Sequence, residues 1–119
     1  MTDKRQVLLV EDNELNRRLF SDLLTILDVG VTAVENGTEA LRVFKERKFD
    51  LILTDIYLPD ISGVELTHII RSNTDGQKVV AVTAAPNIKA AEEFLSEFDA
   101  VIYKPIAVAD FMATVKKFL

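Results

Sequence analysis

Five short, mostly apolar runs recur along the chain, and a segment with helical periodicity follows each of them. The runs cover residues 7–10, 31–34, 51–54, 79–82 and 100–103. They are continuously apolar rather than alternating, which is typical of parallel strands buried on both faces of a sheet. The chain is therefore predicted to form five βα units, and right-handed crossovers place helices on both faces. The expected fold is a doubly wound α/β sandwich of three layers.

Each segment between the runs carries apolar residues at helical spacing. The first helix is expected over residues 13–27, and three more begin after Asn36-Gly37-Thr38, at Gly63 and at Pro86. A last helix is expected across the stripe from Val108 to Leu119. Their apolar stripes, in chain order, are Leu15, Leu19, Leu23, Ile26 and Leu27; Leu41 and Phe44; Leu66, Ile69 and Ile70; Ile88, Ala91, Leu95 and Phe98; and Val108, Phe111, Met112, Val115 and Leu119. These stripes are predicted to pack inward. Val108 and Phe111 are also candidates for an exposed partner patch, but the core is the favoured assignment.

Composition narrows the class of protein. The chain has 119 residues, the size of one domain, and 49% of them are hydrophobic, enough for a packed core. A net charge of −5 argues against a nucleic-acid or anionic-membrane surface. There is no cysteine, and the polar start has no apolar signal core behind it. We expect one cytoplasmic domain over residues 1–119, with no output domain, no nucleic acid and no membrane partner.

Polar residues follow four of the five runs. Glu11 and Asp12 follow the first run, Asp55 the third, Thr83 the fourth and Lys104 the fifth. Ligands of open parallel sheets bind at the carboxyl ends of the strands, so these five side chains should converge. Three carboxylates against one ammonium favour a hard divalent cation, and then a phosphoryl group.

The spacing of these residues resembles the receiver domain of bacterial two-component response regulators, the CheY-like family. The resemblance covers the whole chain. It rests on four motifs: Glu11-Asp12-Asn13, Asp55-x-x-x-Pro59-x-x-x-Gly63, Thr83-Ala84 and Lys104-Pro105. The segment from Val10 to Asn16, followed by Leu19-Phe20, is similar to stand-alone receivers of the DivK kind, and also to receivers within hybrid histidine kinases. The resemblance implies a flavodoxin-like sheet with strand order 2-1-3-4-5.

The resemblance also implies a phosphoryl-transfer chemistry. Asp55 would be the nucleophile that accepts a phosphoryl group from a histidine kinase or phosphotransferase. Asp12, Asp55 and the backbone carbonyl of Tyr57 would bind Mg²⁺, or Mn²⁺ as a substitute, with Glu11 acting through water. Lys104 would pair first with Asp55 and then with a phosphoryl oxygen.

A second set of positions bears on switching and on phosphoryl lifetime. Thr83 would donate its hydroxyl to the phosphoryl group, and the small Ala84 would leave that group room. The output would be a surface of the fourth helix, the fifth strand and the fifth helix that controls a protein partner. Val101 occupies the place of the family's usual switch aromatic and Tyr103 is the nearest ring, so backbone and helix movement is predicted rather than a ring swing.

Four more positions complete the predicted set. Tyr57 would shield the phosphoryl group and Ala85 could not position a water, so slow self-hydrolysis is expected. The family commonly has a cis peptide bond before the residue that is Pro105 here. His68 is assigned to the surface rather than to phosphoryl transfer.

Three alternatives stand beside the response regulator. A Mg²⁺-dependent phosphatase of the haloacid-dehalogenase type would need a second Asp where Tyr57 stands, so a turnover enzyme is disfavoured. A flavodoxin-like cofactor binder would need a phosphate-cradling first loop, but Glu11-Asp12-Asn13-Glu14 would repel phosphate. A receiver within a larger hybrid kinase remains open, although Met1 favours a free-standing protein. A monomer is favoured over a dimer.

Overall fold

The chain forms a five-stranded parallel sheet with the strand order β2-β1-β3-β4-β5, as predicted. The structure is a computed structural model and describes residues 4–84 and 97–119. The strands are β1 (Gln6–Val10), β2 (Gly30–Val34), β3 (Leu51–Thr54), β4 (Val79–Thr83) and β5 (Ala100–Tyr103). The helices are α1 (Glu14–Ile26), α2 (Gly37–Glu46), α3 (Gly63–Asn73) and α5 (Val108–Phe118). Most of the predicted fourth helix lies outside the described residues.

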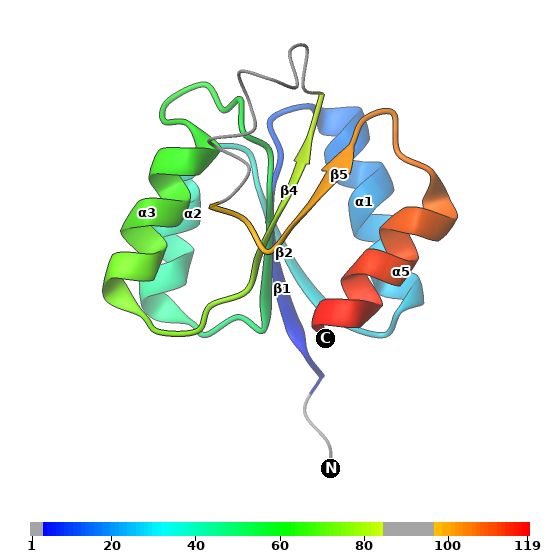
Figure 1. Cartoon of the computed structure of the whole chain (residues 1–119), viewed down its shortest axis with the longest axis horizontal. Coiled ribbons are helices and arrows are strands. Elements are labelled where there is room, and N and C mark those ends of the chain that lie inside the picture. Colours follow the sequence, from blue (N-terminus) through cyan, green and yellow to red (C-terminus); the bar gives the residue numbers. More distant parts are fainter. Residues whose placement is uncertain (1–3, 85–96) are drawn as a thin grey trace.

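Helices cover both faces of the sheet, with α2 and α3 on one side and α1 and α5 on the other (Figure 1). Successive side chains of a strand point to opposite faces, so β1 serves both layers. Val7 and Leu9 pack with α1 and α5, whereas Leu8 and Val10 pack with α2 and α3. The two-sided burial is the physical reason for continuously apolar strands.

The apolar residues of α1 split into two stripes, which corrects the sequence-based prediction. Phe20, Leu23 and Leu24 are buried against the sheet, and the Phe20 ring stacks on Phe111 of α5 with ring centroids 5.4 Å apart. Three residues predicted to pack inward are instead exposed: Leu15, Leu19 and Ile26. At about 100° per residue they lie roughly a third of a turn from the buried face, too far round the helix to reach the sheet.

The last helix gives one confirmed and one wrong prediction. Phe111 is fully buried, as expected for a core residue, but Val108 is 51% exposed. Val108 is the first residue of α5, and helical side chains lean toward the N-terminus. Its side chain therefore extends beyond the helix rather than onto the sheet. None of the helices within residues 4–84 and 97–119 is both long and apolar enough to cross a bilayer.

Side-chain caps place three helix N-termini at the carboxyl edge of the sheet. Asn13, Asn36 and Ser62 each accept a hydrogen bond from the backbone N–H three residues later. Such caps satisfy amides that the first helical turn leaves unpaired. The caps therefore fix where the loops after β1, β2 and β3 end and the following helices begin.

Candidate functional site

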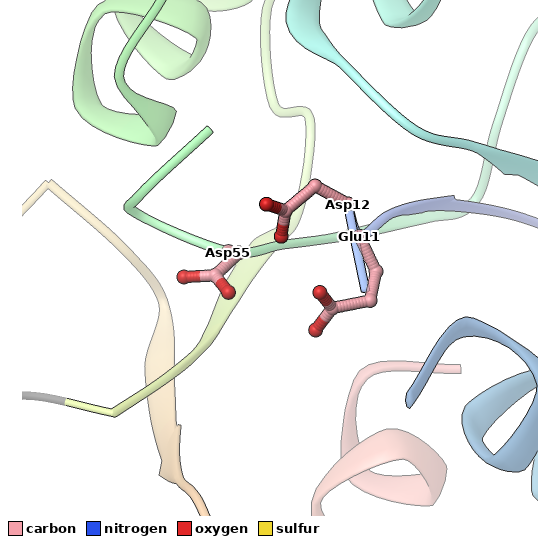
Figure 2. A group of neighbouring side chains, drawn as sticks. All are labelled: Glu11, Asp12 and Asp55. Carbon is pink, nitrogen blue, oxygen red and sulfur yellow. The ribbon is translucent and has the colours of Figure 1, made fainter. Parts of the chain in front are cut away.

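Three carboxylates from two strand ends meet at the carboxyl edge of the sheet. Glu11 and Asp12 directly follow β1, and Asp55 directly follows β3. One oxygen from each of the three lies within 4.8 Å of the others. Figure 2 shows Asp12 and Asp55 facing one another while Glu11 reaches into the same space from the neighbouring position. β1 and β3 are adjacent in the sheet, so their ends bring these groups together.

Asp55 is the most fully engaged of the three carboxylates. It is 6% exposed. Its Oδ1 accepts hydrogen bonds from the Tyr57 backbone N–H at 3.0 Å and the Thr83 hydroxyl at 3.1 Å, and its Oδ2 from the Lys104 ammonium at 2.6 Å. Tyr57, Thr83 and Lys104, which the sequence assigned to the site, thus contact Asp55 from the adjoining loop, β4 and the end of β5.

Glu11 is buried and shares the same ammonium. Its Oε1 lies 2.5 Å from Lys104 Nζ, and its Oε2 accepts from the Asn13 backbone N–H at 3.0 Å. Burial raises the pKa of the Glu11 carboxyl, and this effect exceeds the lowering by the hydrogen bonds from Lys104 and Asn13. The short ion pair shows that Glu11 is an ammonium partner as well as a member of the acidic cluster.

Lys104 connects the ends of β1 and β3 through the two buried carboxylates. Partial burial by itself would lower the pKa of the Lys104 ammonium. The hydrogen bonds and negative charges of Asp55 and Glu11 outweigh burial and raise that pKa above its ordinary value, so the lysine stays protonated. The Lys104–Pro105 peptide bond is cis, in agreement with the family resemblance.

The donor set suits a hard divalent cation. Mg²⁺ binds oxygen ligands and commonly takes one or two carboxylates with water and phosphate oxygens. The cluster offers carboxylate oxygens from Glu11, Asp12 and Asp55, and Asp12 is exposed to solvent while the other two are buried. Asp12 therefore gives the cluster a solvent-exposed carboxylate that a hydrated ion can reach.

Two residues that the sequence did not single out hold the loops around this cluster. Arg17 of α1 donates from one guanidinium nitrogen to the Glu11 carbonyl at 3.0 Å and to the Asp12 carbonyl at 3.4 Å. Asp60 accepts hydrogen bonds from the backbone N–H groups of Gly37, Thr38 and Ile61 and from the Thr38 hydroxyl, at 2.6 to 2.9 Å. Neither contact has a sequence signature.

The remaining predicted positions lie around the cluster. Tyr57 and Tyr103 are exposed, and so are Ala84 and Pro105, while Val101 is half-buried. Ala85 lies outside the described residues. His68 is on the exposed face of α3, with Nε2 3.4 Å from Glu97, so the prediction of a surface position is confirmed.

The fold and the site together define a class of signalling domain. The sequence profile described as "Response regulator receiver domain" matches residues 7–116. The chain belongs to the response regulator receiver domain family. Receivers of this family act in two-component signalling with histidine kinases, and the chain is therefore a signalling domain rather than a turnover enzyme.

Individual relatives refine the assignment. The chain is 40% identical to the polar-differentiation response regulator DivK of Brucella anthropi, over 97% of this chain and 96% of that protein. Among solved structures it is similar to the Thermotoga maritima response regulator TrrA in complex with Mg²⁺-BeF, with 29% identity, a TM-score of 0.88 and coverage of 97% of this chain and 99% of that one. A CheY-like receiver from Methylobacillus flagellatus has 28% identity and a TM-score of 0.85, over 98% and 100% of the two chains.

Proposed function

We propose that this chain is a phosphorylation-dependent switch in which Asp55 accepts a phosphoryl group from a histidine kinase or a histidine phosphotransferase. The observation that carries the proposal is the environment of Asp55. One carboxylate meets a hydroxyl from Thr83, an ammonium from Lys104 and two further carboxylates within a single cluster. These are the groups needed to position a phosphoryl group and to balance its charge.

The proposed reaction is an in-line displacement at phosphorus. A carboxylate oxygen of Asp55 forms a bond to phosphorus while the bond from phosphorus to the donor's histidine nitrogen breaks, and the electron pair of that bond returns to the imidazole. Lys104 then moves from its ion pair with Asp55 to a phosphoryl oxygen, and Thr83 donates its hydroxyl to another. Ala84 is exposed and small, which leaves room beside the acceptor.

Asp12, Asp55 and the Tyr57 backbone carbonyl are proposed to hold Mg²⁺, with Glu11 acting through water. When bound, the ion offsets the negative charge that develops as a phosphoryl group meets a carboxylate. The open side of the acidic cluster and its oxygen-only donor set support this assignment. Mn²⁺ prefers the same kind of oxygen ligand and is proposed as a substitute.

The proposed output runs from Thr83 to a surface of the predicted fourth helix, β5 and α5, where a protein target would bind. Val101 is half-buried and Tyr103 is already exposed at the end of β5. We propose that backbone and helix movement carries the signal. Exposed Tyr57 is proposed to shield the phosphoryl group, and with Ala85 unable to hold a water it makes self-hydrolysis slow.

Residues 1–119 are proposed to act as one receiver domain that works in the cytoplasm as a monomer. The DivK similarity, which covers 97% of this chain and 96% of that protein, supports the assignment of these residues to a single receiver domain. Placement within a hybrid histidine kinase is the alternative.

The test is intact-protein mass spectrometry after incubation with acetyl phosphate and Mg²⁺. Wild type is expected to gain a single phosphoryl group, whereas Asp55→Asn and wild type with excess chelator gain none. Asp50→Asn is the matched control, since it removes an exposed carboxylate from the opposite end of β3. Tyr103 is followed by NMR in the same samples, and a change from exposed to buried would contradict the proposed route of the signal.

Each outcome bears on a separate part of the proposal. An adduct on Asp55→Asn would place the acceptor elsewhere, and an adduct formed in chelator would remove Mg²⁺ from the reaction. Failure of folded wild type to react with either acetyl phosphate or a phosphorylated histidine phosphotransferase would overturn the function. Phosphate loss as fast in wild type as in Tyr57→Ala would remove the shielding role.

A further inference from the structure

Arg17 lies beside the acidic cluster but forms no ion pair with the carboxylates of Glu11 and Asp12. Its guanidinium is half-buried on the first turns of α1 and donates to the backbone carbonyls of Glu11 and Asp12. Within residues 4–84 and 97–119, no ion pair joins Arg17 to either of those carboxylates, whereas Lys104 is paired with Glu11 and Asp55. The two cations near the site therefore contact different parts of it.

The backbone of this loop needs donors from outside the sheet. β1 ends at Val10, and its ladder with β3 ends at the pair Val10 and Thr54. The carbonyls of residues 11 and 12 lie beyond the ladder, and the carbonyl of a buried residue such as Glu11 requires a hydrogen-bond donor. A guanidinium offers several N–H donors from one rigid group, so one side chain can hold two successive carbonyls.

We infer that Arg17 is a positioning residue for the proposed magnesium site: it fixes the backbone that presents Glu11 and Asp12 without bonding either carboxylate. This inference rests on the proposed function of that cluster. Groups that hold metal ligands in place without touching the metal commonly affect affinity by about tenfold or more. Asn13 also holds this loop, because its backbone N–H donates to Glu11 Oε2 and its side chain caps α1.

If Arg17 positions the ligand loop, its removal should change the Mg²⁺ affinity in the direction opposite to that expected from its charge alone. Removing a positive charge near a divalent-cation site should strengthen binding of the ion, because like charges repel. Removing a clamp on the ligand loop should weaken it. Arg17→Met is therefore expected to weaken Mg²⁺ binding about tenfold, and Arg17→Lys, which keeps the charge but loses the guanidinium geometry, to give an intermediate loss.

Arg18→Met is the matched control. Arg18 is exposed, lies on the same helix, carries the same charge, and makes no hydrogen bond or ion pair within the described parts of the chain. Mg²⁺ dissociation constants are measured by isothermal titration calorimetry for wild type, Arg17→Met, Arg17→Lys and Arg18→Met. Acetyl phosphate reaction rates are then measured across Mg²⁺ concentrations, where Arg17→Met should need about tenfold more Mg²⁺ to reach an unchanged maximal rate.

A metal-free readout separates positioning from general stability. Amide hydrogen exchange at Glu11 and Asn13, whose N–H groups bond Val34 O and Glu11 Oε2, should be several-fold faster in Arg17→Met, with the β3 amides unchanged. Mg²⁺ binding as tight in Arg17→Met as in Arg18→Met, or tighter, would overturn the inference. If wild type binds no Mg²⁺, the proposed metal site fails, and exchange at Glu11 and Asn13 alone decides whether Arg17 holds the loop.

Discussion

The loop after β1 and the loop after β3 both carry carboxylates to the site, but different parts of the molecule hold them in place. Arg17 holds the first loop from the helix that directly follows it, five and six residues along the chain. The second loop is held by Asp60, which bonds the start of α2 at Gly37 and Thr38, 23 and 22 residues away. The first loop is a local unit, whereas the second is tied to a separate element.

This difference predicts which property each loop controls when it is mutated: the geometry of the metal ligands or the stability of the fold. A change in the local unit should alter the ligand set while the sheet and helices remain packed. A change in the long-range unit should loosen the contact between α2 and the β3–α3 loop, and so lower the free energy of unfolding. The variants below test that division.

The largest effect is expected at Gly63, where α3 begins directly beside the acceptor. A methyl group there would meet the Asp55 carbonyl oxygen, and it would lie 2.9 Å from Ile56 Cα. These are backbone atoms that cannot rotate away, so Gly63→Ala should lower the free energy of unfolding by about 3 kcal/mol. Urea denaturation measures this loss.

Gly76→Ala is the control for Gly63. Gly76 has nothing within 4 Å of an added Cβ, but its φ is +74°. Strain in that left-handed conformation should cost only about 1 kcal/mol. Equal losses at the two glycines would show that the close approach of α3 to Asp55 is not what requires Gly63.

The second prediction concerns Lys104, which contacts a carboxylate of each loop. Lys104→Met should destabilise the metal-free protein by about 2 kcal/mol, because two buried carboxylates lose the hydrogen bonds of a partly buried ammonium. It should also strengthen Mg²⁺ binding several-fold, since the ammonium no longer competes for Glu11 and Asp55. Calorimetric titration and thermal unfolding with and without Mg²⁺ measure both quantities. Weaker Mg²⁺ binding in Lys104→Met would contradict the contrast with Arg17.

The sequence predicted the parts of this arrangement that repeat a local pattern. Continuous apolar runs indicated a sheet covered on both faces, and residues at strand ends indicated the cluster of Glu11, Asp12, Asp55, Thr83 and Lys104. Strand ends are informative because parallel strands share one carboxyl edge. The residues of the cluster were therefore predictable from the sequence, although the distances between them were not.

The supporting contacts were not predictable in the same way. Arg17 donates to backbone carbonyls, which every residue carries, so no residue type marks its partner. Asp60 bonds Thr38 only because the β3–α3 loop folds over the start of α2, a long-range contact without a periodic signal. The exposed Leu15 and Leu19 also misled the prediction, since helical spacing shows that a stripe exists but not which stripe faces the sheet.

The third prediction tests the long-range brace at Asp60. Hydrogen bonds, first from the Thr38 hydroxyl and then from three backbone N–H groups, lower the pKa of the Asp60 carboxyl well below its ordinary value. Asp60→Asn should lower the free energy of unfolding by about 1 kcal/mol, because a charged acceptor at the start of a helix is lost. Denaturation at neutral pH measures it, with Asp75→Asn as an exposed control.

The same group gives the stability a defined pH dependence. A carboxyl whose pKa is lower in the folded chain than in the unfolded chain stabilises the fold above its unfolded pKa, about 3.9. That contribution is lost as the pH falls below about 4 toward the folded pKa. The difference in stability between wild type and Asp60→Asn should therefore be constant at neutral pH and shrink in acid. A difference that persists unchanged at pH 3 would show that Asp60 acts without its charge.

The smallest effect is expected at Thr38, the partner of Asp60 on α2. Its hydroxyl donates to Asp60 Oδ2 at 2.6 Å, but both side chains are exposed, so Thr38→Val should cost about 0.5 kcal/mol. In a double-mutant cycle, Thr38→Val should cost less on the Asp60→Asn background than on wild type, since the acceptor's charge is already gone. Additive losses would mean that the backbone N–H groups of Gly37 and Thr38 alone hold the loop to α2. The brace would then depend on the position of the helix start and not on the residue at position 38.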